Sequence, residues 1–279
     1  HINADIAHSL LLYARASEDK TFLYRDGAEV LVETARLWAD LGFWRTNGER
    51  QFHVHGVTGP DEYTAVVNNN TFTNLAAQQN LRDAVAAVHR RPDLAEQFGV
   101  TTAEAAHWEA CADDMTIPYD DALGVHQQCE AFTLLGAWDF AASVGKYPLL
   151  LNYPYYDLYR KQVVKQADLV FAMYLFGQAF SPEQKLRNFD YYYPLTVRDS
   201  SLSACTQAVM SAEVGHLELA HDYAYEAALI DLRDLHHNTR DGLHMASLAG
   251  AWTALVSGFG GLRAGGYPPA VRVGQRVRR

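Results

Sequence analysis

The feature that most restricts the fold of this chain is a succession of apolar residues at helical spacing, interrupted by polar loops. Ile6, Leu10, Tyr13 and Ala14 fall on one face of a helical period, which predicts a helix over residues 3–16. The same period recurs along the chain, so we predict about eight or nine helices and almost no strand. Only residues 51–57 alternate polar and apolar side chains as a short strand does.

The remaining helices are predicted from the apolar period and from cap residues. They cover approximately residues 26–41, 72–89, 101–114, 154–176, a segment from 182, 200–214, 216–230 and 244–257. An aromatic loop is expected over 189–197. Such a chain is a helical bundle, a solenoid or a helical toroid. No repeat of about 33–47 residues is present, which argues against a solenoid. The polar loops follow alternate helices, which favours a toroid with one working face.

Composition excludes several classes of function. The chain has 279 residues, 49% of them hydrophobic, and a formal net charge of −10. The acidic charge argues against a nucleic-acid partner or a membrane surface. No apolar run approaches the ~18 residues of a membrane span, and no signal peptide is visible. Cys111, Cys129 and Cys205 are far apart and odd in number, so we predict no disulfide framework and a reducing, cytoplasmic location.

Both ends of the chain depart from an ordinary domain. The sequence begins with His1-Ile2-Asn3 and enters the helical period at once, which predicts a fragment starting inside a domain. Residues 264–279 are rich in Gly and Pro, have four Arg in the last eight positions and show no apolar period. We therefore predict a partial helical domain over 1–263 and a disordered or foreign tail over 264–279.

The segment Gly56–Tyr63 is the best candidate for a reactive loop. Its Gly and Pro residues make a turn that presents two adjacent carboxylates, Asp61 and Glu62. Neighbours in such a segment cannot face the same way, so we expect one to face a pocket and the other to anchor the loop. An ordinary surface turn is the alternative. The amides and hydroxyls of residues 67–74 follow directly and are able to cap a helix or to line a sugar pocket.

Three further groups of residues are able to carry chemistry. Lys165 and Gln166 lie in a predicted helix, where Lys165 has the spacing to pair with Asp168. Polar clusters at 199–203 and 241–250 precede helices and are able to cap them or, if they converge, to bind an anion. His53 and His55 have the spacing of metal ligands on a strand, but no third ligand has a supporting spacing. We therefore predict no metal site.

These segments, in this order, resemble glycoside hydrolase family 65, which contains maltose, trehalose, kojibiose and nigerose phosphorylases and related hydrolases. The resemblance covers residues 1–263 and rests on five motifs, at 1–7, 56–63, 165–168, 199–203 and 242–250. It implies an all-α fold, an (α/α)6 barrel or helical toroid, which we expect to be incomplete in this chain.

The resemblance also implies a reaction and roles for individual residues. Glu62 matches the general acid of the family, and Lys165 and Gln166 match the pair that holds the glucosyl unit. Four residues match the loops that surround inorganic phosphate: Ser200, Ser201, His244 and Ser247. The implied reaction is inverting phosphorolysis of an α-glucosyl disaccharide to β-glucose 1-phosphate and a monosaccharide. Phosphate is then a co-substrate and nucleophile, and no cofactor is implied. Family members are often dimers, so a homodimer is implied for the full-length protein.

Two alternatives stay open, together with several departures from the family pattern. A hydrolase of the same family, such as a trehalase, would place a carboxylate base across the ring from Glu62. An inactive helical fragment would bind only a sugar or a partner. The family's β-sandwich domain, linker, small β domain and first barrel segments, which hold a Trp-Asp pair, have no counterpart here. Arg198 stands where many members have His, and Tyr193 where an acidic residue is common.

Overall fold

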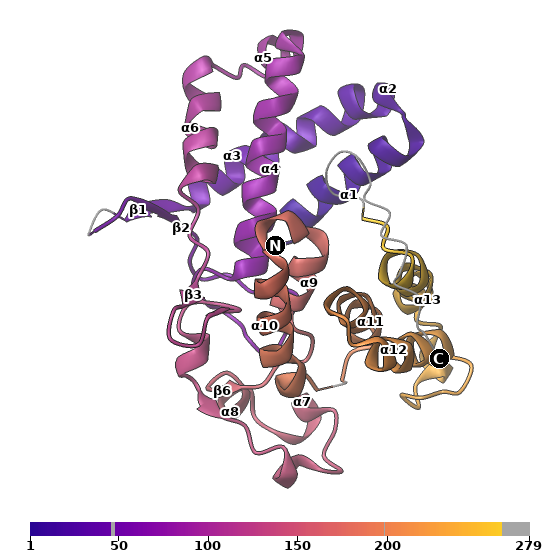
Figure 1. Ribbon diagram of the computed structural model, residues 1–279. Coiled ribbons are helices and arrows are strands. Elements are labelled where there is room, and N and C mark those ends of the chain that lie inside the picture. Colours follow the sequence, from indigo (N-terminus) through magenta and orange to yellow (C-terminus); the bar gives the residue numbers. More distant parts are fainter. Residues whose placement is uncertain (46–47, 198, 264–279) are drawn as a thin grey trace. The chain divides into compact units, whose positions relative to one another are not determined.

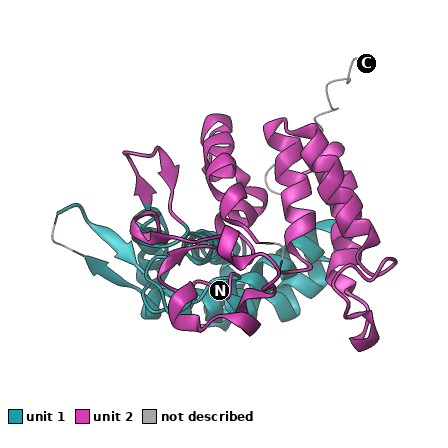
Figure 2. Cartoon of the chain, turned by 90° about the horizontal axis from the view of Figure 1, so that it is seen from below, with its two compact units in different colours: residues 1–60, 65–118, 128–130 teal, residues 61–64, 119–127, 131–279 magenta. Residues whose placement is uncertain are grey.

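The computed structural model describes residues 1–45, 48–197 and 199–263, and Arg198 and the predicted tail 264–279 lie outside the described residues. The chain forms two compact units, which Figure 2 colours separately. The first unit contains residues 1–60, 65–118 and 128–130, and the second contains 61–64, 119–127 and 131–279. Both units are built mainly from helices, which confirms the all-α class. That residues 1–263 form one partial helical domain stays a prediction.

The first unit contains helices and one hairpin (Figure 1). Its elements are α1 (Ile2–Ser17), α2 (Lys20–Phe22), α3 (Ala28–Leu41), β1 (Phe43–Arg45), β2 (Gln51–His53), α4 (Thr71–Arg90), α5 (Pro92–Gln97) and α6 (Thr102–Asp113). A π-helical turn, Leu23–Gly27, joins α2 to α3.

Helix α4 is the centre of the first unit, where it packs against α1, α3 and α6. Asn70 begins it by accepting a hydrogen bond from the Thr73 N–H, as a helix cap does. Leu81 in α4, Trp38 in α3 and Trp108 in α6 are at most 2% exposed. Each such side chain contributes roughly 1.5–3 kcal/mol by leaving water, so these apolar faces hold the unit together.

The predicted strand over 51–57 is shorter in the structure than in the sequence pattern. Strand β2 ends at His53 and pairs antiparallel with β1, with Phe43 opposite His53. On its other edge the Phe52 N–H donates to the Asp114 carbonyl at 2.7 Å, so β2 has backbone partners on both sides.

The second unit contains two helical regions separated by irregular chain (Figure 1). Its elements are β3 (Tyr119–Asp120), β4 (Val125–His126), β5 (Gly136–Ala137), α7 (Leu149–Asn152), α8 (Tyr155–Leu158), β6 (Lys161–Gln162), α9 (Asp168–Leu175), α10 (Pro182–Tyr192), α11 (Ser203–Val214), α12 (Leu217–Leu229) and α13 (Met245–Thr253). Helix α13 continues into a π-helical turn, Ala254–Phe259.

Two apolar clusters support the second unit. One surrounds Tyr63 and consists of Tyr63, Leu149, Leu158, Val163 and Val197. The other joins α11, α12 and the turn after α13 through small side chains and consists of Ala204, Ala208, Tyr223, Ala227 and Ala254. Small residues let these helices approach closely, and a Cβ placed on Gly250 would lie 2.6 Å from Cys205. Gly250 of α13 therefore lies against the first turn of α11.

The predicted helix over 154–176 is wrong. Helix α8 ends at Leu158, and α9 begins only at Asp168. Strand β6 lies between them and pairs with β5, and the backbone N–H of Lys165 donates to the Asp61 carboxylate. These partners, which are distant in sequence, replace the helical hydrogen bonds. Tertiary contacts therefore override the helix that the local apolar period favours.

The predicted aromatic loop over 189–197 is also wrong in its first half. Helix α10 continues to Tyr192, and a 3-10 turn over Tyr193–Leu195 follows. Phe189 and Tyr192 are at most 1% exposed. Their rings pack in the interior, which makes this stretch helical core.

Two helices expose apolar faces. In α1, Ile2 and Ile6 are more than half exposed, and along α13 and the turn after it Met245, Trp252 and Leu255 are 61–68% exposed. A soluble domain rarely leaves such a row in water. None of the helices in the described part of the chain is long and apolar enough to cross a membrane.

Candidate functional site

The two adjacent carboxylates of the central loop have opposite environments. Asp61 is fully buried, whereas the Glu62 side chain is 59% exposed. Asp61 accepts hydrogen bonds from the Lys165 N–H at 2.9 Å and the Thr64 hydroxyl at 3.1 Å. This confirms that one of the two acids anchors the loop, and the other turns outward; that Glu62 faces a pocket stays a prediction.

Glu62 and Lys165 form an ion pair in the second unit. Lys165 Nζ lies 2.7 Å from Glu62 Oε2. The predicted pair of Lys165 with Asp168 assumed a helix through both residues, but Lys165 precedes α9 and its side chain reaches Glu62 instead. The structure thus brings together the expected general acid and an expected sugar ligand that lie 103 positions apart.

Gln166 joins the same site through the loop before α11. The Ser200 hydroxyl donates to Gln166 Oε1 at 2.8 Å, and the Ser203 hydroxyl donates to the Lys165 carbonyl at 3.0 Å. Ser201 follows Ser200 and is partly exposed. Four of the seven residues singled out in the sequence are therefore linked by direct contacts: Glu62, Lys165, Gln166 and Ser200.

The polar cluster at 199–203 does not cap α11 as predicted. Leu202 occupies the cap position, without a side-chain cap bond. Asp199 instead accepts hydrogen bonds from the Tyr63 hydroxyl and from the Leu149 N–H. Its carboxylate links the loop by a hydrogen bond to the segment that carries Glu62. No local sequence pattern predicts this role.

His244 and Ser247 begin α13 and have different surroundings. The His244 ring nitrogen Nδ1 lies 2.5 Å from Asp231, and the His244 N–H donates to the same carboxylate at 2.8 Å. The bond to His244 holds the pKa of Asp231 below its usual value. Ser247 is fully buried and points to the Ala227 carbonyl at 3.5 Å. His244 therefore has an oriented ring, whereas the Ser247 hydroxyl faces the helix interface.

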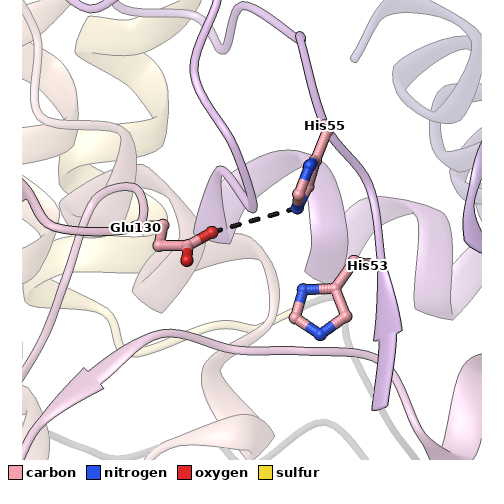
Figure 3. Close-up of side chains that lie close together, drawn as sticks. All are labelled: His53, His55 and Glu130. Carbon is pink, nitrogen blue, oxygen red and sulfur yellow. Dashed lines mark ion pairs between the residues drawn. The ribbon is translucent and has the colours of Figure 1, made fainter. Parts of the chain in front are cut away.

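The first unit brings a third residue to the two histidines of β2 and its loop. Possible ligand atoms of His53, His55 and Glu130 lie within 4.8 Å of one another, and Figure 3 shows His55 turned toward Glu130. The amide nitrogen of Asn69 is 2.8 Å from His53 Nδ1 and 3.0 Å from Glu130 Oε2. This donor joins His53 and Glu130 by hydrogen bonds, whereas Nε2 of His53 and of His55 is buried without a hydrogen-bond partner among the described residues.

The electrostatics of this cluster act on a cation in two directions: the lowered pKa of His53 keeps its ring neutral, the form that binds a metal, whereas Arg45 competes for the carboxylate. Burial first, and then the charges of Arg45 and His55, lower the pKa of His53. Arg45 lies 3.8 Å from Glu130 and competes with any other cation for that carboxylate. The absence of a metal ion from the function of the chain stays a prediction.

Comparison with known proteins identifies the family of this chain. Residues 1–253 match the model of the glycosyl hydrolase family 65 central catalytic domain. The chain is 64% identical over 263 residues to a protein named uncharacterized glycosyl hydrolase from Mycobacterium tuberculosis. It is 43% identical over 272 residues to alpha,alpha-trehalose phosphorylase from Geobacillus stearothermophilus.

The matches cover nearly all of this chain and a minor part of its relatives. Each of these two alignments includes 94% of the chain but only 33% and 35% of the relative. A solved structure described as a putative kojibiose phosphorylase from human microbiome superposes with a TM-score of 0.84 at 29% identity, over 93% of this chain and 39% of that one. The chain thus spans about a third of the length of its relatives. Its motifs, its helices and these matches agree that the chain belongs to glycoside hydrolase family 65.

Proposed function

We propose that the protein is an inverting glycosyl phosphorylase that cleaves an α-glucosyl disaccharide to β-glucose 1-phosphate and a monosaccharide. The observation that carries this proposal is the outward-facing Glu62 beside Lys165, with Gln166 and Ser200 joined to the same loop. Relatives named as phosphorylases of trehalose, kojibiose and maltose, at 32–43% identity, support it.

In this proposal Glu62 is the general acid. It gives its proton to the glycosidic oxygen as the bond between that oxygen and C1 breaks. Phosphate attacks C1 from the opposite face and forms the new C–O bond, so the configuration at C1 inverts. Lys165 and Gln166 bind hydroxyls of the glucosyl unit. Since Lys165 Nζ is 2.7 Å from Glu62 in the unliganded chain, sugar binding exchanges this partner for a hydroxyl and frees Glu62 for the leaving oxygen.

The phosphate ligands in this proposal are Ser200, Ser201, His244 and Ser247. Asp231 holds Nδ1 of the His244 ring, which leaves Nε2 as the ring nitrogen to meet an anion. Ser200 supplies a hydroxyl at the start of the loop before α11. The assignment of Ser247 as a phosphate ligand rests on the family resemblance, because its hydroxyl is buried against α12.

A family hydrolase is the second candidate, favoured by the name of the 64% identical relative. It requires a carboxylate base opposite Glu62 to activate water. In the second unit Asp199 accepts hydrogen bonds from Tyr63 and Leu149. Asp61 and Asp168 are fully buried and accept from backbone N–H groups. A phosphate nucleophile needs no such base, which is why we prefer phosphorolysis.

The test measures release of glucose 1-phosphate from trehalose, maltose, kojibiose and nigerose, with and without phosphate. Release that needs phosphate and falls about 10²–10⁴-fold in Glu62→Gln supports the proposal. Glu29→Gln, an exposed glutamate of α3, is the matched control and should change nothing. Free glucose without phosphate would establish a hydrolase. No turnover by a folded chain would favour the binding-only alternative.

A further inference from the structure

We propose that Asp61 is a positioning residue, which holds the backbone of Lys165 and Gln166 against the loop of Glu62 so that the acid and its neighbours keep their geometry. This inference rests on the proposed function, because it gives Asp61 a task only if Glu62 delivers a proton. Asp61 itself is fully buried and has no access to a substrate.

The carboxylate of Asp61 connects two segments that are far apart in sequence. It accepts from the N–H groups of Lys165 at 2.9 Å and Gln166 at 3.5 Å, and locally from the N–H of Tyr63 at 3.2 Å. The Thr64 hydroxyl donates to its second oxygen at 3.1 Å. Hydrogen bonds to an ionised acceptor are stronger than neutral ones, so this carboxylate is a firm joint between the segments.

Asp168 makes the reverse connection. The Asp61 N–H donates to Asp168 Oδ1 at 2.7 Å, and Asp168, the first residue of α9, is also fully buried. Each segment thus supplies a carboxylate to the backbone of the other. The Ser203 hydroxyl holds the Lys165 carbonyl from a third segment, so the backbone of Lys165 is held at both its N–H and its carbonyl.

This joint sets the place of two flexible side chains. Glu62 lies between Asp61 and Tyr63, both of which are fully buried, while its own side chain is exposed. Lys165 reaches it from a backbone that Asp61 holds. A shift of about 1 Å at a reacting group is able to cost ~10²-fold in rate. Loss of the Asp61 carboxylate should therefore damage proton delivery while leaving the rest of the unit folded.

The chemistry of the leaving group separates positioning from general structural damage. A disaccharide loses an alkoxide, which requires a proton from Glu62. α-Glucosyl fluoride loses fluoride, which departs without a proton, so its phosphorolysis depends little on the acid. Displacement of Lys165 and Gln166, which bind the glucosyl unit of both donors, should raise KM for both. A loss of kcat through misplaced Glu62 should fall on the disaccharide and much less on the fluoride.

The experiment compares wild type, Asp61→Asn and Asp157→Asn with a disaccharide and with α-glucosyl fluoride, both with phosphate. Asp157 is an exposed aspartate of α8 and controls for the substitution itself. We expect Asp61→Asn to lower kcat for the disaccharide about 10–100-fold and to change kcat for the fluoride by less than about 3-fold. Glu62→Gln should likewise leave kcat for the fluoride within about 3-fold of wild type. Equal losses on both donors, or an unchanged disaccharide rate, would overturn the inference.

Hydrogen exchange tests the joint without any turnover. The amides of Lys165 and Gln166 should be protected in wild type and lose protection in Asp61→Asn, while the amide of Leu149, which donates to Asp199, stays protected. Unchanged protection of the Lys165 amide in Asp61→Asn would refute the claim that Asp61 holds this backbone. If wild type turns over neither donor, the proposed function fails for this chain. Hydrogen exchange alone then tests whether Asp61 holds the backbone of Lys165 and Gln166. Asp168→Asn provides a second variant, with the same selective loss of about 3–10-fold, should Asp61→Asn not fold.

Discussion

Replacing Tyr63 with Phe removes one hydroxyl from the interior of the second unit and keeps the ring. Tyr63 is fully buried among Leu149, Leu158 and other apolar side chains, and its hydroxyl donates to Asp199. A hydrogen bond to a charged acceptor contributes about 1.5–3 kcal/mol. The Leu149 N–H donates to Asp199 at 2.8 Å in the wild-type chain, and the substitution does not remove this donor. We therefore expect the free energy of unfolding of this unit to fall by about 2 kcal/mol at neutral pH.

The same substitution should change how stability depends on pH. Burial, followed by the bond to Asp199, raises the pKa of Tyr63 well above its ordinary value of 10.0. A group whose pKa is raised on folding contributes stability that is complete below its unfolded pKa and is lost as pH rises beyond it. The difference between wild type and Tyr63→Phe should therefore be full below pH 10 and shrink above it.

Urea unfolding at pH 7 and at several values above pH 10 measures both effects. Tyr155→Phe is the matched control, because Tyr155 is 55% exposed, and this variant should match wild type at each pH. Hydrogen exchange at Leu149 reports the local loss, since its amide shares the acceptor. A Tyr63→Phe change below about 0.5 kcal/mol at pH 7, or a gap that stays constant to high pH, would refute the reasoning.

Two further predictions concern packing. Gly250→Ala places a Cβ 2.6 Å from the Cβ and Sγ of Cys205, so α13 has to move from α11, and we expect thermal unfolding to show a loss of about 1–3 kcal/mol; an unchanged midpoint would mean that these helices are farther apart. Trp108→Ala empties a site that is 1% exposed in the first unit and should cost about 3–5 kcal/mol in urea unfolding. Trp252→Ala, at 64% exposure, should cost within about 0.5 kcal/mol, and equal losses for the two tryptophans would contradict the assigned burial.

The local pattern of the sequence was sufficient for most helices. The predicted helices over 3–16, 72–89 and 101–114 correspond to α1, α4 and α6 within about two residues. Thr101 caps α6 by accepting from the Glu104 N–H. These elements have an apolar face, a cap and a stop within one short segment, so the information that forms them is local.

The pattern failed where remote groups replace local hydrogen bonds. Residues 159–167 continue a helical period, but β5 pairs with Lys161–Gln162 and Asp61 accepts from the Lys165 N–H, so the stretch is not helical. Glu130 approaches His55 from far along the chain, which no spacing between histidines predicts. The link between Tyr63 and Asp199 spans 136 positions. Such contacts have no signature within either segment.

The sequence by itself determined the helical class, the central loop with its two carboxylates and, through its motifs, the family. It also indicated that one of the two acids had to anchor the loop, because neighbours in an extended segment point apart. Only the tertiary structure decided which one: Asp61 lies buried among N–H donors from Lys165 and Gln166, and Glu62 remains outside beside the Lys165 ammonium. The physical reason is that burial of a carboxylate requires donors to satisfy it, and here the donors far along the chain come from a segment about 100 residues away whose position only the fold defines.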